Sequence, residues 1–255
     1  ALLLAVLMVA SLCACGQKGT GSDLQTVTKG KLIMSTNAEF APYEYVADDG
    51  KGFQGTGYEG IDIEIAYALA QKLGLELVVD NMDFDAALSA VQTGKSDMVA
   101  AGVTVTPDRL NAMSFTDSYA NGVQVVIVKE GSDIKSIDDL QGKKIGTQRG
   151  TTGFLYCSDD FGDDNVIGFD DGATAVQNLK AGKVDCVVID NAPAQEYVKA
   201  NPGLTILDTE YANEDYAIGI AKDNTALQEA LNKALAELKA DGTIQSIIDK
   251  YIPAK

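Results

Sequence analysis

The sequence predicts an α/β protein built as two similar lobes that face each other across a cleft. Short apolar segments typical of strands alternate with segments whose apolar residues recur at helical spacing, and this alternation indicates mostly parallel sheets. One short unit also occurs twice, at 90–99 and at 178–187. Ligands of open α/β sheets bind beyond the carboxyl ends of the strands, so two facing lobes would enclose a binding site.

Local patterns place the individual elements. A helix is expected at 61–73, where Ile61, Ile65 and Leu69 recur at helical spacing and Gly74 ends the pattern. A shorter helix is expected at 84–93, and a long C-terminal helix carries the apolar stripe Leu227 to Leu238, with a last helix after Gly242. Strands are expected at 31–36, 75–80, 97–106, 123–129, 144–148, 166–169 and 184–190. The Gly-rich stretch 50–57 lacks the pattern of a phosphate-binding loop and indicates a hairpin or surface loop.

The repeated unit reads AVQTGKSDMV at 90–99 and NLKAGKVDCV at 178–187. Each copy is the end of a helix, a Gly-Lys turn, and an Asp that leads into an apolar strand. Gly-Lys is also a common turn between a helix and a strand, which is the simpler explanation of the match. Together with the alternation of elements, the repeat favours one copy in each lobe.

Composition excludes several classes of function. The 255 residues include 37 acidic and 20 basic side chains, for a net charge of −17, which argues against a nucleic acid partner. The chain has no His, so Ser-His-Asp and Cys-His catalysis and the commonest metal ligand are absent. We expect no metal and no cofactor, and we interpret most of the acidic charge as a solvated surface.

The first residues indicate export. The apolar run 1–12 is too short to span a membrane, which takes about 20 residues, and predicts a signal peptide over 1–15. Its end, Leu12-Cys13-Ala14-Cys15, resembles a bacterial lipobox, with Cys15 as the expected lipidation site; the alternatives are Cys13 or a signal peptide with incidental cysteines. The polar, Gly-rich segment 16–30 would be a flexible tether. Export permits a disulfide between Cys157 and Cys186, and two buried free thiols are equally compatible with the sequence.

Seven motifs carry a resemblance to a known family: FAPYE at 40–44, GYEGIDIEIA at 57–66, DFD at 83–85, AGVTVTPDR at 101–109, FTDSY at 115–119, QRGTT at 148–152 and VID at 188–190. In this order they resemble the extracellular solute-binding proteins of ABC-type importers for polar amino acids, over 31–251. The resemblance implies a periplasmic-binding-protein-like fold with lobe 1 formed by 31–120 and 216–255. Hinge strands near 121–125 and 213–218 and lobe 2 would occupy 121–215.

The resemblance also implies the partners. The chain would be a monomer that binds a free polar amino acid (glutamine, arginine, lysine or histidine) and delivers it to the permease subunits of an ABC transporter. It would be held by lipid at the outer face of the cell membrane, in the periplasm if the source is Gram-negative. Two alternatives remain: a dehydratase of the same fold acting on small carboxylates, and an amino-acid sensor that feeds no transporter.

The charged ends of an amino acid set the requirements for such a site. Burying a carboxylate and an ammonium is favourable only when each meets a fixed partner. Arg109 can offer a guanidinium fork to the carboxylate, unless it is a surface helix residue paired with Asp108. Asp190, at the end of an apolar strand, can pair with the ammonium, unless it is only the N-cap of the following segment.

The other expected site residues follow from the motifs. Within 101–104 the resemblance implies that Gly102 offers a carbonyl to the ammonium and Thr104 a hydroxyl or N–H to the carboxylate, beside Ala101. Thr152 lies at a strand-to-helix junction that favours an anion, and it could also be an N-cap. Phe40 and Phe84 resemble the aromatic pair that packs on the ligand side chain, with core packing as the alternative. Asn37 stands where binders of cationic amino acids often carry Asp, and Gln148 and Glu39 are further candidates near the side chain.

Overall fold

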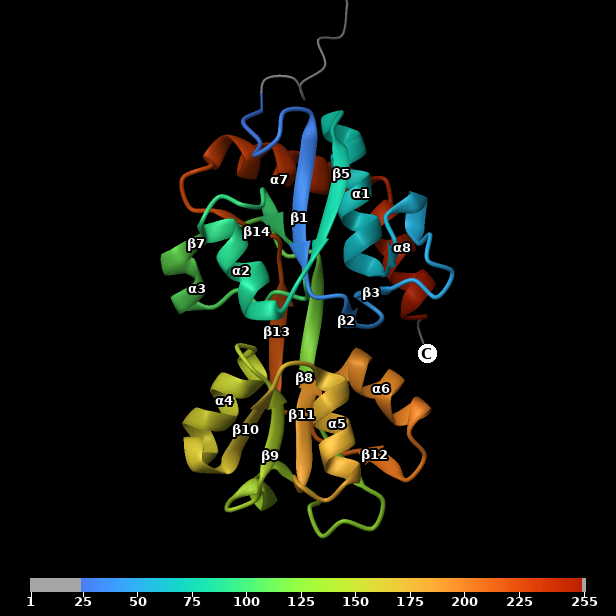
Figure 1. Ribbon diagram of the computed structural model, residues 1–255, viewed down its shortest axis with the longest axis vertical. Helices are drawn as coiled ribbons and strands as arrows, with labels where there is room; N and C mark the ends of the chain where they lie inside the picture. Colours follow the sequence, from blue (N-terminus) through green and yellow to red (C-terminus); the bar gives the residue numbers. More distant parts are fainter. Residues whose placement is uncertain (1–23, 254–255) are drawn as a thin grey trace, which may run out of the picture.

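The computed structural model describes residues 24–253. The predicted signal peptide, its lipidation site Cys15 and residues 16–23 of the predicted tether lie outside the described residues. Two α/β lobes lie one above the other, and strands β8 (Ala120–Lys129) and β13 (Ala212–Tyr216), which pair antiparallel, run between them (Figure 1). The prediction of two α/β lobes is therefore confirmed. None of the helices in 24–253 has the length and apolar character of a membrane span.

Lobe 1 contains a five-stranded sheet in the order β5-β1-β6-β14-β7. Its strands are β1 (Lys31–Thr36), β5 (Glu76–Asn81), β6 (Met98–Val99), β7 (Met113–Phe115) and β14 (Gly219–Ala221). Its helices are α1 (Ile61–Leu73), α2 (Phe84–Gln92), α3 (Pro107–Ala112), α7 (Thr225–Ala240) and α8 (Thr243–Tyr251). A small sheet of β2 (Glu39–Phe40), β3 (Glu44–Val46) and β4 (Tyr58–Glu59), with a 3-10 turn (Phe53–Gly55), lies beside α1. The chain thus returns to lobe 1 for its last helices, drawn in red in Figure 1.

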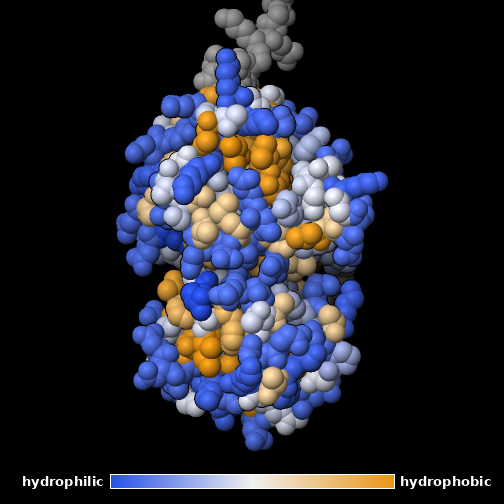
Figure 2. All heavy atoms as spheres, viewed as in Figure 1, coloured by the Kyte–Doolittle hydropathy of each residue, from blue (hydrophilic) through white to orange (hydrophobic). Residues whose placement is uncertain are grey.

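Lobe 2 is built around the strand order β10-β9-β11-β8-β12, with β13 also paired to β8. Its remaining strands are β9 (Ile145–Gln148), β10 (Val166–Phe169), β11 (Cys186–Asp190) and β12 (Leu204–Ile206). Its helices are α4 (Thr152–Phe161), α5 (Gly172–Lys180) and α6 (Asn191–Ala200), with 3-10 turns at Ile137–Leu140 and Asp163–Asn165. Hydrophilic residues cover most of the face seen in Figure 2, with apolar patches on both lobes.

The expectation of mostly parallel sheets is only partly right. Strands β5, β1 and β6 run parallel, as do β10, β9 and β11. Strand β14 is antiparallel to both of its neighbours, and β8 pairs antiparallel with β11, β12 and β13. Strands β8 and β13 carry the chain between the lobes, and β14 follows β13 directly, so these strands enter their sheets without the helical crossover that makes neighbouring strands parallel.

The strand expected at 97–106 is mostly wrong, since only Met98–Val99 forms one. Gly102 has a φ of 53°, in the left-handed region that an extended strand does not use, so the chain turns there. The helix α3 that follows was considered only as an alternative for Arg109 and was not among the expected elements. Its N-cap is Thr106, whose hydroxyl accepts a 3.2 Å hydrogen bond from the Arg109 N–H, and Pro107 occupies its first position.

The repeated unit plays the same part in both lobes. In lobe 1, Asp97 exchanges two hydrogen bonds with Ile33: its N–H donates to the Ile33 carbonyl (2.9 Å), and its Oδ2 accepts from the Ile33 N–H (2.7 Å). In lobe 2, Asp185 makes the same pair with Lys144, at 2.8 Å and 2.8 Å. The Asp of each copy therefore begins the pairing of a parallel strand with its neighbour and fixes their register.

Asp97 also holds the segment before β1. Its Oδ1 accepts a 2.7 Å hydrogen bond from the Val27 N–H, and Asn224 donates to the Gln25 carbonyl at 3.2 Å. The predicted tether is thus fixed to lobe 1 from Gln25 on, a correction to its expected length.

In lobe 2, Cys157 and Cys186 are buried free thiols. Of the two alternatives for this pair, a disulfide or free thiols, the structure thus has the second.

Candidate ligand-binding site

A pocket lies between the lobes where the two sheets face each other, and it encloses about 450 Å³ including its opening. This size is in the usual range for small-molecule sites, roughly 300–1,000 Å³. The structure brings all ten expected site residues to its wall: Asn37, Phe40, Phe84, Ala101, Gly102, Thr104, Arg109, Gln148, Thr152 and Asp190. It is also lined by Glu44, Gln124, Thr151, Val188 and Ile189, which the sequence analysis did not include.

Arg109 reaches the pocket from the first turn of α3. Its Nη1 donates to the Thr104 carbonyl (2.8 Å) and its Nη2 to the Gly150 carbonyl of lobe 2 (3.2 Å), and its guanidinium carbon lies 5.4 Å from the centre of the Phe84 ring. Burial lowers the pKa of Arg109, while Glu214 and other acidic groups oppose this effect. The alternative pairing with Asp108 does not occur among the ion pairs of residues 24–253. Because a guanidinium has five N–H donors, several remain for an anion in the pocket.

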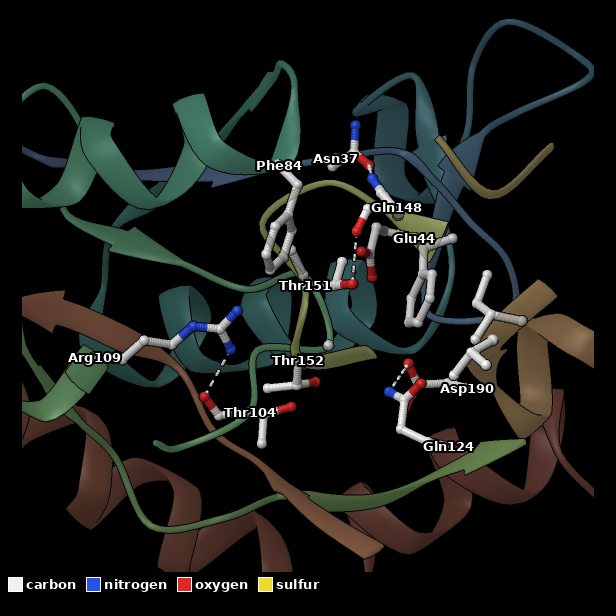
Figure 3. A pocket seen from close by; sticks show the side chains of 15 residues that line it. Asn37, Glu44, Phe84, Thr104, Arg109, Gln124, Gln148, Thr151, Thr152 and Asp190 are labelled. Atoms are coloured by element: carbon white, nitrogen blue, oxygen red, sulfur yellow. Dashed lines mark hydrogen bonds between the residues drawn. The ribbon is translucent and has the colours of Figure 1, made fainter. Parts of the chain in front are cut away.

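Asp190 lies at the end of β11, on the side of the pocket opposite Arg109 (Figure 3). It occupies the N-cap position of α6, but its side chain makes no capping hydrogen bond. Instead, Oδ2 accepts from Gln124 Nε2 at 2.9 Å and Oδ1 accepts from the Tyr216 hydroxyl. Burial, together with the nearby Glu214, raises the pKa of Asp190 to about 7. Asp190 is thus the N-cap residue of α6 by position, as the alternative expected, but its side chain does not cap the helix and instead lines the pocket.

The strand-to-helix junction in lobe 2 divides its roles between two threonines. Thr151 is the N-cap of α4, and its hydroxyl accepts a 3.3 Å hydrogen bond from the Phe154 N–H. The capping role considered for Thr152 therefore belongs to its neighbour. Thr152 is the first residue of the helix and is buried against the pocket, so its backbone N–H lies at the positive end of the helix, which favours an anion.

The two phenylalanines form part of the pocket wall from lobe 1. Phe84 begins α2 and Phe40 ends β2, and both are nearly buried. Phe40 fits closely over Gly102: a Cβ atom at that glycine would lie 2.8 Å from Phe40 Cε1. The φ of 53° and this contact together explain why the position requires glycine. The loop can therefore pass directly behind the aromatic wall.

Hydrogen bonds other than that of Tyr216 to Asp190 also join the lobes around the pocket. Gln148 Nε2 donates to Asn37 Oδ1 at 2.9 Å, and the Tyr197 hydroxyl donates to the Glu39 carbonyl at 3.1 Å. A third is the Arg109–Gly150 contact. Glu39 was expected beside the ligand side chain, but it is exposed and does not belong to the residues that line the pocket. The structure thus has the lobes closed on each other.

Glu44 is the main residue that the sequence analysis missed. It begins β3 and is 1% exposed, and neither carboxyl oxygen has a hydrogen-bond partner within residues 24–253. In Figure 3 its carboxyl group points into the pocket. Burial raises the pKa of Glu44 well above its usual range, and the neighbouring Asp62 adds to this effect. The only sequence signal was its place in the FAPYE motif, because a Glu in a short strand is usually solvated.

Comparisons with known proteins match nearly the whole chain. The family model described as bacterial extracellular solute-binding proteins, family 3, matches residues 32–254. The ABC transporter arginine-binding protein 1 of Escherichia coli is 34% identical over 228 residues (88% of this chain and 91% of that protein). The arginine-binding extracellular protein ArtP of Bacillus subtilis is 33% identical, covering 98% of this chain and 96% of that one. The probable histidine-binding protein of Neisseria gonorrhoeae is also 33% identical (94% and 90%).

Solved structures agree with these sequence matches. An ancestral arginine-binding protein bound to arginine is 42% identical with a TM-score of 0.80, covering 88% of this chain and 99% of that one. An ancestral arginine-binding protein bound to glutamine is 40% identical with a TM-score of 0.82 (89% and 100%). The similarity thus extends over both lobes and the cleft between them.

Proposed function

Because the chain belongs to family 3 of the bacterial extracellular solute-binding proteins, we propose that it binds a cationic amino acid, arginine above all, for import by an ABC transporter. The resemblance identified from the seven motifs is confirmed, and the chain is an amino-acid-binding protein of an ABC import system. The family consists of binding proteins, so the dehydratase alternative is wrong. The finer proposal concerns which amino acid enters and which residues hold it.

The ends of the pocket suit the two charged groups that all free amino acids share. We assign the α-carboxylate to the free N–H groups of Arg109, with Thr104 and the N-terminal end of α4 at Thr152 close by. We assign the α-ammonium to Asp190 and to the Gly102 carbonyl. Since Arg109 belongs to lobe 1 and Asp190 to lobe 2, a ligand held by both stabilises the closed arrangement.

Glu44 is the single observation that favours a cationic side chain. A buried carboxyl group whose carboxyl neighbour, Asp62, offers it no positive charge is unfavourable by several kcal/mol when ionised, and a guanidinium or ammonium would supply the missing cation. Phe40 and Phe84 provide aromatic faces, which also attract cations. Asn37 departs from the Asp common in binders of cationic amino acids, and Glu44 would take over its charge. The arginine-binding relatives support the same choice.

Calorimetric titration tests the proposal. We expect the protein to bind arginine at least tenfold more tightly than citrulline, the uncharged analogue of the same shape. The Glu44→Gln variant should reduce this ratio to near one, because the amide no longer attracts a cation, while binding of citrulline changes little. Equal affinity of the unmodified protein for both ligands, or no binding of arginine, would contradict the cationic assignment.

We also propose that Cys15 carries a lipid that holds the protein at the outer face of the membrane and that permease subunits receive the ligand there. The lipobox-like sequence supports the first part, and the ABC-transporter relatives support the second. Mass spectrometry of the N-terminus of the protein from membranes tests the anchor. A diacylglyceryl mass on Cys15 is expected, and release of an unmodified chain into the medium would contradict it.

A further inference from the structure

Glu44 adjoins a second buried carboxyl group, that of Asp62. The Asp62 N–H donates to the carbonyl of Tyr43, the residue before Glu44, at 2.8 Å, which brings the first turn of α1 against the start of β3. Glu44 and Asp62 are each 1% exposed. Asp62 Oδ2 accepts from the Gly102 N–H (2.9 Å) and from the Tyr119 hydroxyl (2.8 Å), whereas Oδ1, like both oxygens of Glu44, has no donor among residues 24–253.

The groups around Glu44 offer it no positive charge. Within residues 24–253, the titratable groups that interact with it are Asp62 on α1, Asp190 at the end of β11, and the phenols of Tyr43 and Tyr119. No ion pair within residues 24–253 includes Glu44 or Asp62. Two carboxylates that adjoin in a dry interior cannot both ionise at neutral pH, so together they retain a proton.

The pKa values agree with this geometry. Burial raises the pKa of Asp62 to about 6, although the hydrogen bonds from Gly102 and Tyr119 lower it. Glu44 receives no donor from the backbone, and its pKa lies well above its usual range through burial and through Asp62. Asp62 is thus the member that carries the charge, and Glu44 is the member that holds the proton.

We propose that the Glu44–Asp62 pair keeps one proton in the ligand-free protein and releases it to solvent when the cationic end of the ligand reaches Glu44. This inference rests on the proposed function. The exchange keeps the charge of the buried site constant, because one positive charge enters as one proton leaves, so no uncompensated charge is left in the interior. Asp62 acts as a positioning residue: its charge adds to burial in favouring the protonated form of Glu44, and its carboxylate holds the Gly102 loop by accepting a hydrogen bond from the Gly102 N–H.

A pH dependence follows from the exchange. Below the pKa of the ligand-free pair, arginine must displace a proton, so its affinity rises as the pH rises, by up to tenfold per pH unit for one full proton. Above that pKa no proton remains, and the affinity levels off. Citrulline brings no cation to Glu44 and releases no proton there. The arginine-to-citrulline affinity ratio should therefore increase with pH.

Calorimetry in buffers of different ionisation enthalpy measures the proton directly. Titrations of the unmodified protein with arginine and with citrulline, between pH 6 and pH 8, give the number of protons released with each ligand. Both ligands carry the same α-ammonium, so any proton released from Asp190 cancels in the difference. We expect arginine to release between a few tenths of a proton and one proton more than citrulline. Binding of arginine with equal proton numbers overturns this inference alone; absence of arginine binding overturns the proposed function as well.

Two variants separate the proton exchange from structural effects. In Asp62→Asn the like charge is lost while burial remains, so the pKa of Glu44 should fall; arginine still binds, and the excess proton release at pH 8 should be smaller than in the unmodified protein. A purely structural Asp62 would instead weaken both ligands equally and leave the excess unchanged, which would overturn the inference. Glu39→Gln, at an exposed carboxylate that does not line the pocket, is the matched control and should keep the excess at the value of the unmodified protein.

Discussion

Gln148 of lobe 2 donates a 2.9 Å hydrogen bond to Asn37 of lobe 1, and both side chains are buried between the lobes. Asn37 also donates to the Met82 carbonyl, and Gln148 to the Asp170 carbonyl, so each amide is held by its own lobe before it meets the other. The contact therefore forms only when the lobes close. A neutral pair at this point joins them without adding charge beside Glu44.

Loss of the Asn37–Gln148 contact should weaken ligand binding. We expect Asn37→Ala to raise the Kd for arginine by about threefold to tenfold, because a hydrogen bond of this kind contributes roughly 0.5–1.5 kcal/mol to the closed state. Calorimetry at one pH measures the change. Asn178→Ala, which removes an exposed amide in α5, is the control and should leave Kd unaffected. An unaltered Kd in Asn37→Ala would show that closure does not depend on this bond.

Arg109 should be indispensable for binding and dispensable for folding. Arg109→Ala removes the proposed partner of the α-carboxylate, so no binding should be measurable by calorimetry, while the circular dichroism spectrum stays the same. Arg109→Lys should bind at least a hundredfold more weakly than the unmodified protein, since an ammonium cannot reproduce the bidentate contact and the bonds to Thr104 and Gly150 together. Arg149→Ala, which removes an exposed ion pair with Asp170, is the matched control. Retained affinity in Arg109→Ala would reject this site.

Gly102 should tolerate no side chain. Gly102→Ala places a Cβ atom 2.8 Å from Phe40 Cε1 at a φ of 53°. The left-handed backbone alone costs an L-residue about 1–2 kcal/mol. Gly131→Ala shares the positive φ but has no atom within 4 Å of the added Cβ, so it reports the backbone cost alone. Thermal denaturation should show a larger loss of Tm for Gly102→Ala than for Gly131→Ala, together with weaker arginine binding. Equal losses would mean that Phe40 moves aside freely.

The main-chain subsites could be predicted from sequence because their residues lie in compact motifs. Arg109, Gly102 and Thr104 all belong to one nine-residue segment, and Asp190 ends an apolar strand. The lobes were also predictable, because the alternation of elements follows from local apolar patterns, and Asp97 and Asp185 of the repeat begin the same kind of strand pairing in each lobe.

Glu44 could not be predicted in the same way. The role of Glu44 in the pocket depends on its burial against α1. The sequence does not show that these two segments lie close together. Helix α3 was not among the expected elements for another reason. The apolar run before it resembles one long strand at 97–106, although Gly102 interrupts it. The Thr106-Pro107 pair did carry a capping signal for this helix.

Asp190 should make the ligand-free protein less stable at neutral pH. Its pKa is raised from 3.8 to about 7, so between roughly pH 4 and pH 7 the folded protein binds a proton that the unfolded chain does not. The contribution of this group to the free energy of unfolding therefore decreases as the pH rises through that window. Asp190→Asn removes the buried charge, while its amide oxygen can still accept a hydrogen bond from Gln124 or Tyr216.

We expect ligand-free Asp190→Asn to have a higher Tm than the unmodified protein at pH 8 and a similar Tm at pH 4.5. The same variant should bind arginine at least tenfold more weakly at pH 8, because the α-ammonium loses its carboxylate. Thermal denaturation at the two pH values, with and without arginine, checks both effects. A lower Tm of the variant at pH 8 would mean that the hydrogen bonds from Gln124 and Tyr216 stabilise the carboxylate more than burial opposes it.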